Sequence, residues 1–196
     1  FELERLKIEA ILFQTGYLTI QYRDPDGLIQ LDYPNKEVRD SMLEHLIEGF
    51  TGVSVERSTA LVIRLRNAFI SDDIEQAMHI LRSVFAGIPY FLHEKYPEKF
   101  FHAAIHLLFT YMGIRIHSEV CTSDGRVDSM VETPTRVYIL EYKLDKTPEE
   151  AVEQIKRKKY YRSAWAAGKP VVGVGVNFSS ATKNIEGWTA ETLDGA

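Results

Sequence analysis

Two runs rich in β-branched and aromatic residues, 127–132 and 136–143, lie on either side of the short segment Thr133-Pro134-Thr135. Such residues favour β-strands, and a proline between two threonines favours a turn, so the pattern predicts a β-hairpin. This hairpin constrains the chain more than any other stretch, because strand pairing determines which of its polar side chains can meet.

The turn sets the register of the predicted hairpin. If the loop consists of residues 134–135, the register that follows places Asp128 directly opposite Glu141, with their Cβ atoms about 5 Å apart. Side chains alternate between the two faces of a strand, so Glu141 shares a face with Lys143. A slip of one residue would turn Asp128 to the opposite face.

Two carboxylates placed in this way repel each other unless a cation lies near them. Lys143 supplies one positive charge, but it lies along the strand rather than between Asp128 and Glu141. A divalent ion between the two acids fits better, and oxygen ligands with room for water suit Mg²⁺ or Mn²⁺. The alternative is an ion-pair cluster at the surface end of a strand.

The motifs Gly125-Arg126-Val127-Asp128 and Glu141-Tyr142-Lys143 resemble the PD-(D/E)XK nuclease superfamily, in the form found in bacterial recombination exonucleases. The resemblance is closest to bacterial proteins in which the nuclease domain follows an ATPase-like domain. It covers most of the chain and also includes residues 13–18, 88–90, 141–145, 154–156 and 174–178. It implies an α/β fold with a restriction-endonuclease-like core, in which helices flank a mixed sheet in the order helix, three strands, helix, strand.

The resemblance also implies roles for the residues of the hairpin. Asp128, Glu141 and the backbone carbonyl of Tyr142 would be metal ligands, and Lys143 would position water or stabilise charge on the phosphate. Glu119, in the strand expected before the hairpin, has three open interpretations: a partner of Arg126, an acid of the metal site, or a solvent-facing residue.

A helix is predicted from Pro97 to the glycine at position 113, and related exonucleases carry a metal-binding histidine on the corresponding helix. His102 is therefore the candidate for a third protein ligand. Glu98 lies on the same helix face and is the alternative ligand, or it orients the histidine. His106 remains open, as does a merely structural role for these residues.

Thr147 and Glu150 form the pattern of a helix start, and the predicted helix extends to Ala167. Gln154 on this helix matches a glutamine of the related exonucleases and would orient Lys143 or contact a phosphate. Those enzymes carry a tyrosine four residues later, where this chain has Lys158. Tyr161, seven residues after Gln154, would lie on the same helical face.

The chain of 196 residues carries a net charge of −5, which by itself is unfavourable for binding nucleic acid. Residues 143–169, however, contain eight basic and four acidic side chains. This local excess predicts contacts with the phosphate backbone, although a solvated helix face gives the same pattern. The candidate nucleic-acid-binding residues are Arg126, Lys156, Lys158, Lys159 and Arg162.

Upstream of the hairpin, the sequence predicts a helix in residues 2–15 and a second hairpin from 17–22 and 28–33. This arrangement suggests a winged helix, which would bind DNA or join domains. Arg23 is the only basic residue in that hairpin, which favours the joining role. The predicted domains are 1–90, a mostly helical region that links to an absent ATPase-like domain, and 91–196, the nuclease-like domain.

Several protein classes are excluded or disfavoured by the composition. The one cysteine, Cys121, excludes an internal disulfide and a zinc site built from several cysteines. No apolar run is long enough to span a membrane, and no secretory signal is recognised, so a soluble, cytoplasmic protein is expected. A start at Phe1 rather than methionine suggests a fragment of a longer protein.

Taken together, these features predict a Mg²⁺- or Mn²⁺-dependent nuclease that acts on DNA. One alternative is a catalytically inactive domain that binds nucleic acid. The other is a module that binds a protein partner, such as the ATPase-like region.

Overall fold

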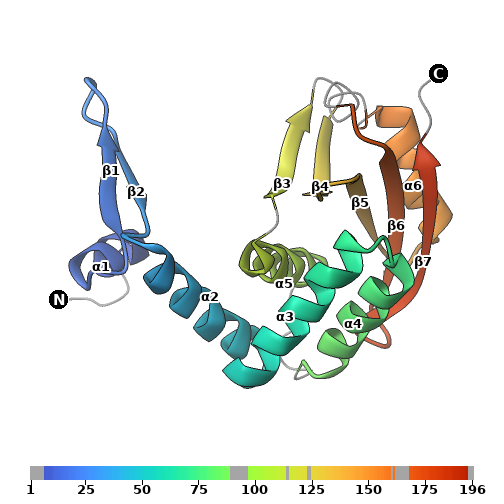
Figure 1. The fold of residues 1–196 in the computed structure, drawn as a ribbon, viewed down its shortest axis with the longest axis horizontal. Coiled ribbons are helices and arrows are strands. Elements are labelled where there is room, and N and C mark those ends of the chain that lie inside the picture. Colours follow the sequence, from blue (N-terminus) through green and yellow to red (C-terminus); the bar gives the residue numbers. More distant parts are fainter. Residues whose placement is uncertain are drawn as a thin grey trace. The chain divides into compact units, whose positions relative to one another are not determined.

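The computed structural model describes residues 7–88, 97–113, 115–122, 125–159, 161 and 168–193. It divides into two compact units, Phe1–Leu46 and Ile47–Ala196, each described here by itself. The elements, labelled in Figure 1, are α1 (Ile8–Gln14), β1 (Thr19–Arg23), β2 (Ile29–Asp32), α2 (Lys36–Thr51), α3 (Val55–Ile70), α4 (Ile74–Ala86), α5 (Pro97–Met112), β3 (Arg115–Thr122), β4 (Gly125–Glu132), β5 (Val137–Leu144), α6 (Pro148–Lys158), β6 (Val171–Ser179) and β7 (Asn184–Leu193).

The first unit contains α1, the antiparallel hairpin β1–β2 and most of α2. Gly16 follows α1 in the left-handed region, with φ of 82°, which ends the helix without steric cost. Asn35 caps α2 by accepting a hydrogen bond from the Val38 N–H at 2.9 Å. The predicted helix and hairpin are therefore confirmed for the residues that the structure describes.

The second unit is built on a five-stranded sheet in the order β3-β4-β5-β6-β7. Among the described strands, only β5 and β6 pair in parallel, and α6 makes the crossover between them. Apolar residues of β5 alternate between two cores. Tyr138, Leu140 and Tyr142 pack with α3, α4 and α5, whereas Val137 and Ile139 pack with Ile155 of α6. Helices therefore cover both faces of the sheet (Figure 1).

Aromatic packing joins the helices to the sheet in the larger core. Phe178 of β6 stacks on Phe101 of α5 with ring centroids 4.3 Å apart, and its edge meets Phe85 of α4 at 5.1 Å. The turn between α3 and α4 is bound to β5 as well, because Asp72 accepts hydrogen bonds from the Tyr138 hydroxyl at 2.6 Å and pairs with Arg136 at 2.8 Å. These contacts hold β5 in place from the side of α3–α5.

The restriction-endonuclease-like core expected from the sequence is confirmed, with two differences in its elements. Residues 184–193 form a fifth strand, β7, that was not predicted. The last predicted helix is shorter than expected within the described residues, because α6 ends at Lys158. Lys159 adopts a left-handed backbone with φ of 51° and its N–H bonds to the Lys156 carbonyl, three residues back, which closes the helix.

The compact units divide between residues 46 and 47. Helices α3 and α4, which precede the boundary expected near residue 90, therefore belong to the same unit as the sheet. Their apolar residues share one continuous core with β5 and β6. None of the described helices combines the length and the apolar character needed to cross a membrane.

Candidate active site

The hairpin β4–β5 has the register that its turn predicts. The Thr133 N–H donates to the Arg136 carbonyl at 2.9 Å, and the strand pairing runs from Glu132↔Val137 to Ser129↔Leu140. The pairing stops at that point. One position further on, the Tyr142 N–H donates instead to the Asp128 carboxylate, Oδ2, at 2.9 Å. A side chain thus replaces the backbone ladder where the two acids come together.

Glu141 lies under α6, and only 2% of the residue is exposed. Its Oε1 accepts a hydrogen bond from Lys143 Nζ at 3.0 Å and a second, short one from Gln154 Nε2. Lys143 Nζ also donates to Gln154 Oε1 at 2.8 Å. The acid, the amine and the amide therefore form a closed triangle that orients all three groups.

The other carboxylate oxygen of Glu141, Oε2, is buried and has no hydrogen-bond partner in the described part of the chain. Buried carboxylate oxygens almost always have a partner, because an unsatisfied one costs free energy. Burial and the neighbouring negative charge of Asp128 raise the pKa of Glu141 to about 7, although Lys143 and Gln154 favour the charged form. Both observations indicate a place for a cation beside Glu141 and Asp128.

His102 of α5 approaches Asp128 from the other side. Its Nδ1 lies 3.9 Å from Asp128 Oδ1, and its ring meets the ring of Tyr142 edge-on at 5.3 Å. The second ring nitrogen, Nε2, is buried and has no hydrogen-bond partner among the described atoms. Burial raises the pKa of the Tyr142 phenol well above its usual range, so the hydroxyl stays protonated.

The donor set fits a hard divalent cation. Glu141 has one carboxylate oxygen without a hydrogen-bond partner in the described residues, and Asp128 Oδ1 has only His102 at 3.9 Å beside it. Oxygen donors of this kind suit Mg²⁺ or Mn²⁺. Within the described ranges, no three His, Cys, Asp or Glu side chains are gathered closely enough to hold a metal alone. An ion at this site would complete its coordination with backbone oxygen, water or a substrate phosphate, as Mg²⁺ commonly does.

The structure thus brings together Asp128, Glu141, Tyr142, Lys143, Gln154 and His102. The side chains of Glu98, Glu119 and Arg126, and residue Arg162, lie outside the described part of the chain. Tyr161 lies beyond the end of α6, so the expectation that it shares a helical face with Gln154 is wrong. It packs instead beside the smaller core under α6.

The predicted nucleic-acid-binding lysines differ in their surroundings. Lys156 is held by two acids, Glu153 at 3.2 Å and Glu191 at 2.8 Å, so its charge is largely neutralised locally. Lys158 and Lys159 lie at the end of α6, and Lys159 is exposed. Positive charge therefore remains at the end of α6, about one turn beyond Gln154.

Two loops at the end of the parallel strand pair were not identified from the sequence. The Asp145 carboxylate accepts the Ser180 N–H at 2.8 Å, and Asn177 Oδ1 accepts the Lys146 N–H at 3.1 Å. These bonds fasten the segment after Lys143 to the end of β6. A polar Asn177 in an otherwise apolar strand was the sequence signal that could have indicated this contact.

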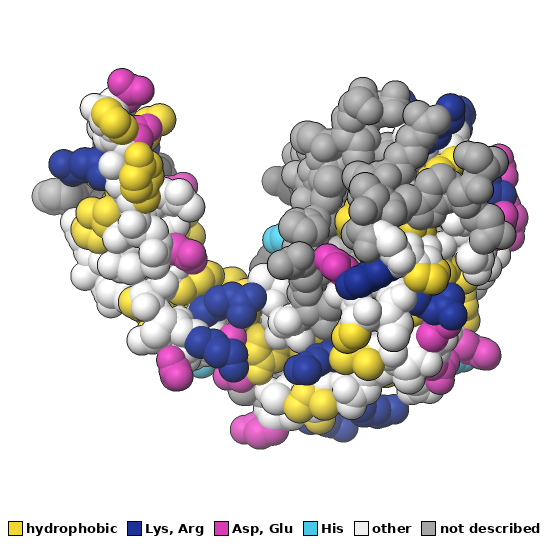
Figure 2. Space-filling view, turned by 45° about the horizontal axis from the view of Figure 1, so that its top comes forward, with side chains coloured by type: hydrophobic (Ala, Val, Ile, Leu, Met, Phe, Trp, Pro, Cys, Tyr) yellow, Lys and Arg dark blue, Asp and Glu magenta, His cyan; other side chains and the backbone are white. Residues whose placement is uncertain are grey.

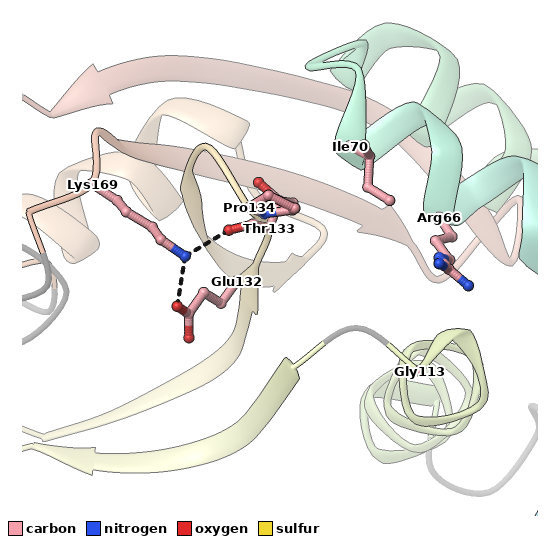
Figure 3. A pocket seen from close by; sticks show the side chains of 7 residues that line it. All are labelled: Arg66, Ile70, Gly113, Glu132, Thr133, Pro134 and Lys169. Carbon is pink, nitrogen blue, oxygen red and sulfur yellow. Dashed lines mark hydrogen bonds and ion pairs between the residues drawn. The ribbon is translucent and has the colours of Figure 1, made fainter.

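A separate pocket of about 310 Å³ lies at the turn of the hairpin, and neither Asp128 nor Glu141 lines it. Figure 3 shows Lys169 at its wall, with its amine directed at Glu132 and the Thr133 carbonyl, both at 2.8 Å. The Lys169 amine is thus already bound within the protein. These two bonds connect the segment before β6 to the turn of the hairpin.

Comparisons with known proteins agree with the fold. Residues 96–188 match a family model described as the PD-(D/E)XK nuclease superfamily, and this match supports the assignment of that part of the chain to the superfamily. All six residues that meet at the site fall within the matched segment. No solved structure matches the chain.

The chain is also 31% identical over 204 residues to a protein of Azotobacter chroococcum mcd 1, described as an uncharacterized protein in the vnfD 5' region. The match includes 98% of this chain and 39% of that protein. The chain therefore spans about two-fifths of the length of this relative.

Proposed function

We propose that residues 96–188, as a member of the PD-(D/E)XK nuclease superfamily, hydrolyse phosphodiester bonds of DNA with the help of a divalent metal. The observation that carries the proposal is the buried, unpartnered oxygen of Glu141 beside Asp128. A cation there would remove both the unsatisfied oxygen and the repulsion between the two acids. The match to the superfamily supports the same reading.

Asp128 and Glu141 would hold Mg²⁺ or Mn²⁺ together with the backbone carbonyl of Tyr142, and His102 is the proposed further ligand. When bound, the metal polarises the scissile phosphate and lowers the pKa of water. Asp128 is prepared for this role because its second oxygen is fixed by the Tyr142 N–H. Fixed ligands reduce the cost of ordering the site when metal and substrate arrive.

Lys143 would stabilise negative charge that develops on the phosphate. Its side chain is mostly buried, and Glu141 and Gln154 hold its amine within 3.0 Å and 2.8 Å. An amine held by neighbours in this way keeps its charge directed at one place. Gln154 is the positioning residue, because it touches both Lys143 and Glu141.

The proposed substrate is bound through its backbone, by Lys158, Lys159 and the further basic side chains Arg126 and Arg162. Such binding would be weakly sequence-specific and strongly salt-dependent. The resemblance to bacterial nucleases joined to an ATPase-like domain leads us to propose the same association for this protein. The greater length of the Azotobacter relative is compatible with an additional domain.

A cleavage assay on plasmid, linear and single-stranded DNA with Mg²⁺, Mn²⁺ or EDTA tests the proposal. Asp128→Asn, Glu141→Gln and Lys143→Ala should each reduce cleavage by at least about 100-fold, since each removes a charge at the reacting centre. Glu132→Gln is the matched control, because this acid lies on the same hairpin but at its other end. It should leave cleavage within about 2-fold.

Two outcomes would contradict the nuclease assignment. Cleavage that persists in EDTA or in Glu141→Gln would come from a contaminating enzyme. Binding of DNA without cleavage in either metal would identify a binding module instead.

A further inference from the structure

The described residues of the first unit form almost no core of their own. Among its described residues, 7–46, only Leu43 is buried. By contrast, eight of the ten large hydrophobic side chains that are exposed in the described chain belong to this unit: Ile8, Ile11, Phe13, Tyr17, Ile20, Tyr22, Leu28 and Ile29. Figure 2 shows hydrophobic side chains at the surface of the part formed by α1, β1 and β2.

The hairpin concentrates aliphatic residues on one of its faces. Cross-strand partners share a face, and Ile20 pairs with Leu31 while Arg23 pairs with Ile29. Since Leu31 and Ile29 are two residues apart, Ile20, Ile29 and Leu31 lie on the same side of the hairpin. Ile20 is 44% exposed and Ile29 45% exposed, so the described residues of the unit itself leave close to half of each residue uncovered.

A two-stranded hairpin with an uncovered aliphatic face is at most marginally stable in water. Burial of apolar side chains is the usual source of stability for a unit of this size. Concentrated exposed apolar surface on a soluble protein generally marks an interface. The unit therefore needs a partner surface that is apolar.

The charge of the unit distinguishes between a nucleic acid and a folded protein as its partner. Residues 1–46 contain five basic and nine acidic side chains, a net charge of −4. A nucleic-acid surface would be repelled, because phosphate binding depends on lysine and arginine. A folded protein surface is the partner that fits.

We propose that the aliphatic face of Ile20, Ile29 and Leu31 docks onto a further folded domain of the same polypeptide. The match to the Azotobacter relative includes 98% of the chain and therefore all or nearly all of this unit. More than half of that relative lies outside the match, since only 39% of it is covered. Polypeptide of that extent in the same chain is large enough to form the missing surface and is present at high effective concentration.

Hydrogen exchange of the hairpin backbone, residues 17–33, tests the proposal in the native gene product and in the 196-residue chain. In the gene product, the hairpin should exchange at least about 10-fold more slowly than in the 196-residue chain. The double substitution Ile20→Asp, Ile29→Asp should abolish this protection. The same substitution should leave exchange in the 196-residue chain unchanged, because both side chains are already exposed there.

Gln30→Asp is the matched control, since Gln30 lies between Ile29 and Leu31 on the opposite face of the hairpin. It should leave the protection intact. A gene product without further domains, or a hairpin whose protection is the same in both chains, would overturn the proposal. Protection that rises with protein concentration would also overturn it, and would indicate a second copy as the partner. The experiment needs neither metal nor DNA, so its result is independent of the proposed nuclease activity.

Discussion

At the residue scale, the site is organised by one buried carboxyl group with two different oxygens. Oε1 of Glu141 is bound by Lys143 and Gln154, whereas Oε2 has no partner among the described residues. The first set of bonds favours the charged form of the acid, and burial beside Asp128 opposes it. Without a cation, these opposing effects raise the pKa of Glu141 to about 7, so the group is about half protonated at neutral pH.

This balance predicts a pH-dependent stability in the absence of metal. The pKa of Glu141 rises to about 7 in the folded protein from an ordinary value of 4.5. Below pH 4.5 the acid is protonated in both states, and between pH 4.5 and 7 only the folded state retains the proton. The free energy of unfolding should therefore decrease as pH rises through this window, by at most about 3 kcal/mol, and then level off.

Chemical denaturation in EDTA between pH 4 and 8 measures this effect, and Glu141→Gln should remove the Glu141 contribution to the slope. Saturating Mg²⁺ or Mn²⁺ should restore stability above pH 7 if the metal binds the folded site. Identical pH profiles for the wild type and Glu141→Gln would contradict the assignment of the buried acid.

Gln154 is expected to act through its two neighbours rather than on the substrate. Gln154→Ala should lower kcat by about 10-fold with little change in KM, because Lys143 loses one of the groups that orient its amine. Glu153→Ala, at the preceding and exposed position, is the matched control and should have little effect on kcat. Steady-state cleavage kinetics distinguish the two, and an equal loss in both variants would point to damage to α6 instead.

At the element scale, α6 lies so close to the sheet that β6 needs a glycine beneath it. A Cβ built on Gly175 would lie 2.0 Å from the backbone carbonyl oxygen of Pro148, which cannot move away as a flexible side chain could. This close approach brings Gln154 within reach of Glu141 and Lys143. The first turn of α6 thus sets the position of the amide in the site.

Gly175→Ala should therefore destabilise the fold by about 3 kcal/mol or more, since it forces α6 away from the sheet. Gly49→Ala is the control, because a Cβ at Gly49 has open space around it and alanine favours the helix. Thermal unfolding should show a lower Tm for the first variant and an equal or higher Tm for the second. An unchanged Tm for Gly175→Ala would contradict the close packing of α6 on β6 at this position.

The sequence specified some of these elements better than others. The register of β4–β5 was predictable because the two-residue turn at Pro134 and Thr135 leaves little freedom for a slip. Strand β7 was not, since its alternation is interrupted by Gly187 and its exposed positions are polar. The end of α6 was also unpredictable, because lysine rarely adopts the left-handed backbone found at Lys159.

Asp128, Glu141 and Lys143 of the candidate site could be picked out from the sequence, because they belong to two short motifs. The sequence did not predict where the backbone pairing of β4 and β5 ends. At that point Asp128 accepts a hydrogen bond from the Tyr142 N–H. That bond depends on a local divergence of strands that no residue pattern encodes. The hydrogen bonds of Gln154 likewise depend on how closely α6 packs over β5.

At the scale of the whole molecule, the two compact units differ in how they are stabilised. Unit Ile47–Ala196 has a large aromatic core that joins α3, α4 and α5 to the sheet. Among the described residues of unit Phe1–Leu46, only Leu43 is buried and eight large hydrophobic side chains are exposed. The first is equipped to fold around the candidate site, and the second depends on a partner surface.

The crossover from β5 through α6 to β6 has a consequence for the order in which the protein matures during synthesis. A nascent chain that has emerged only as far as Lys143 already contains both acids and the amine. Gln154 joins them later, and α6 is seated only when β6 has been made and paired. In the proposed nuclease, the complete site would therefore form only after translation has passed the last parallel strand.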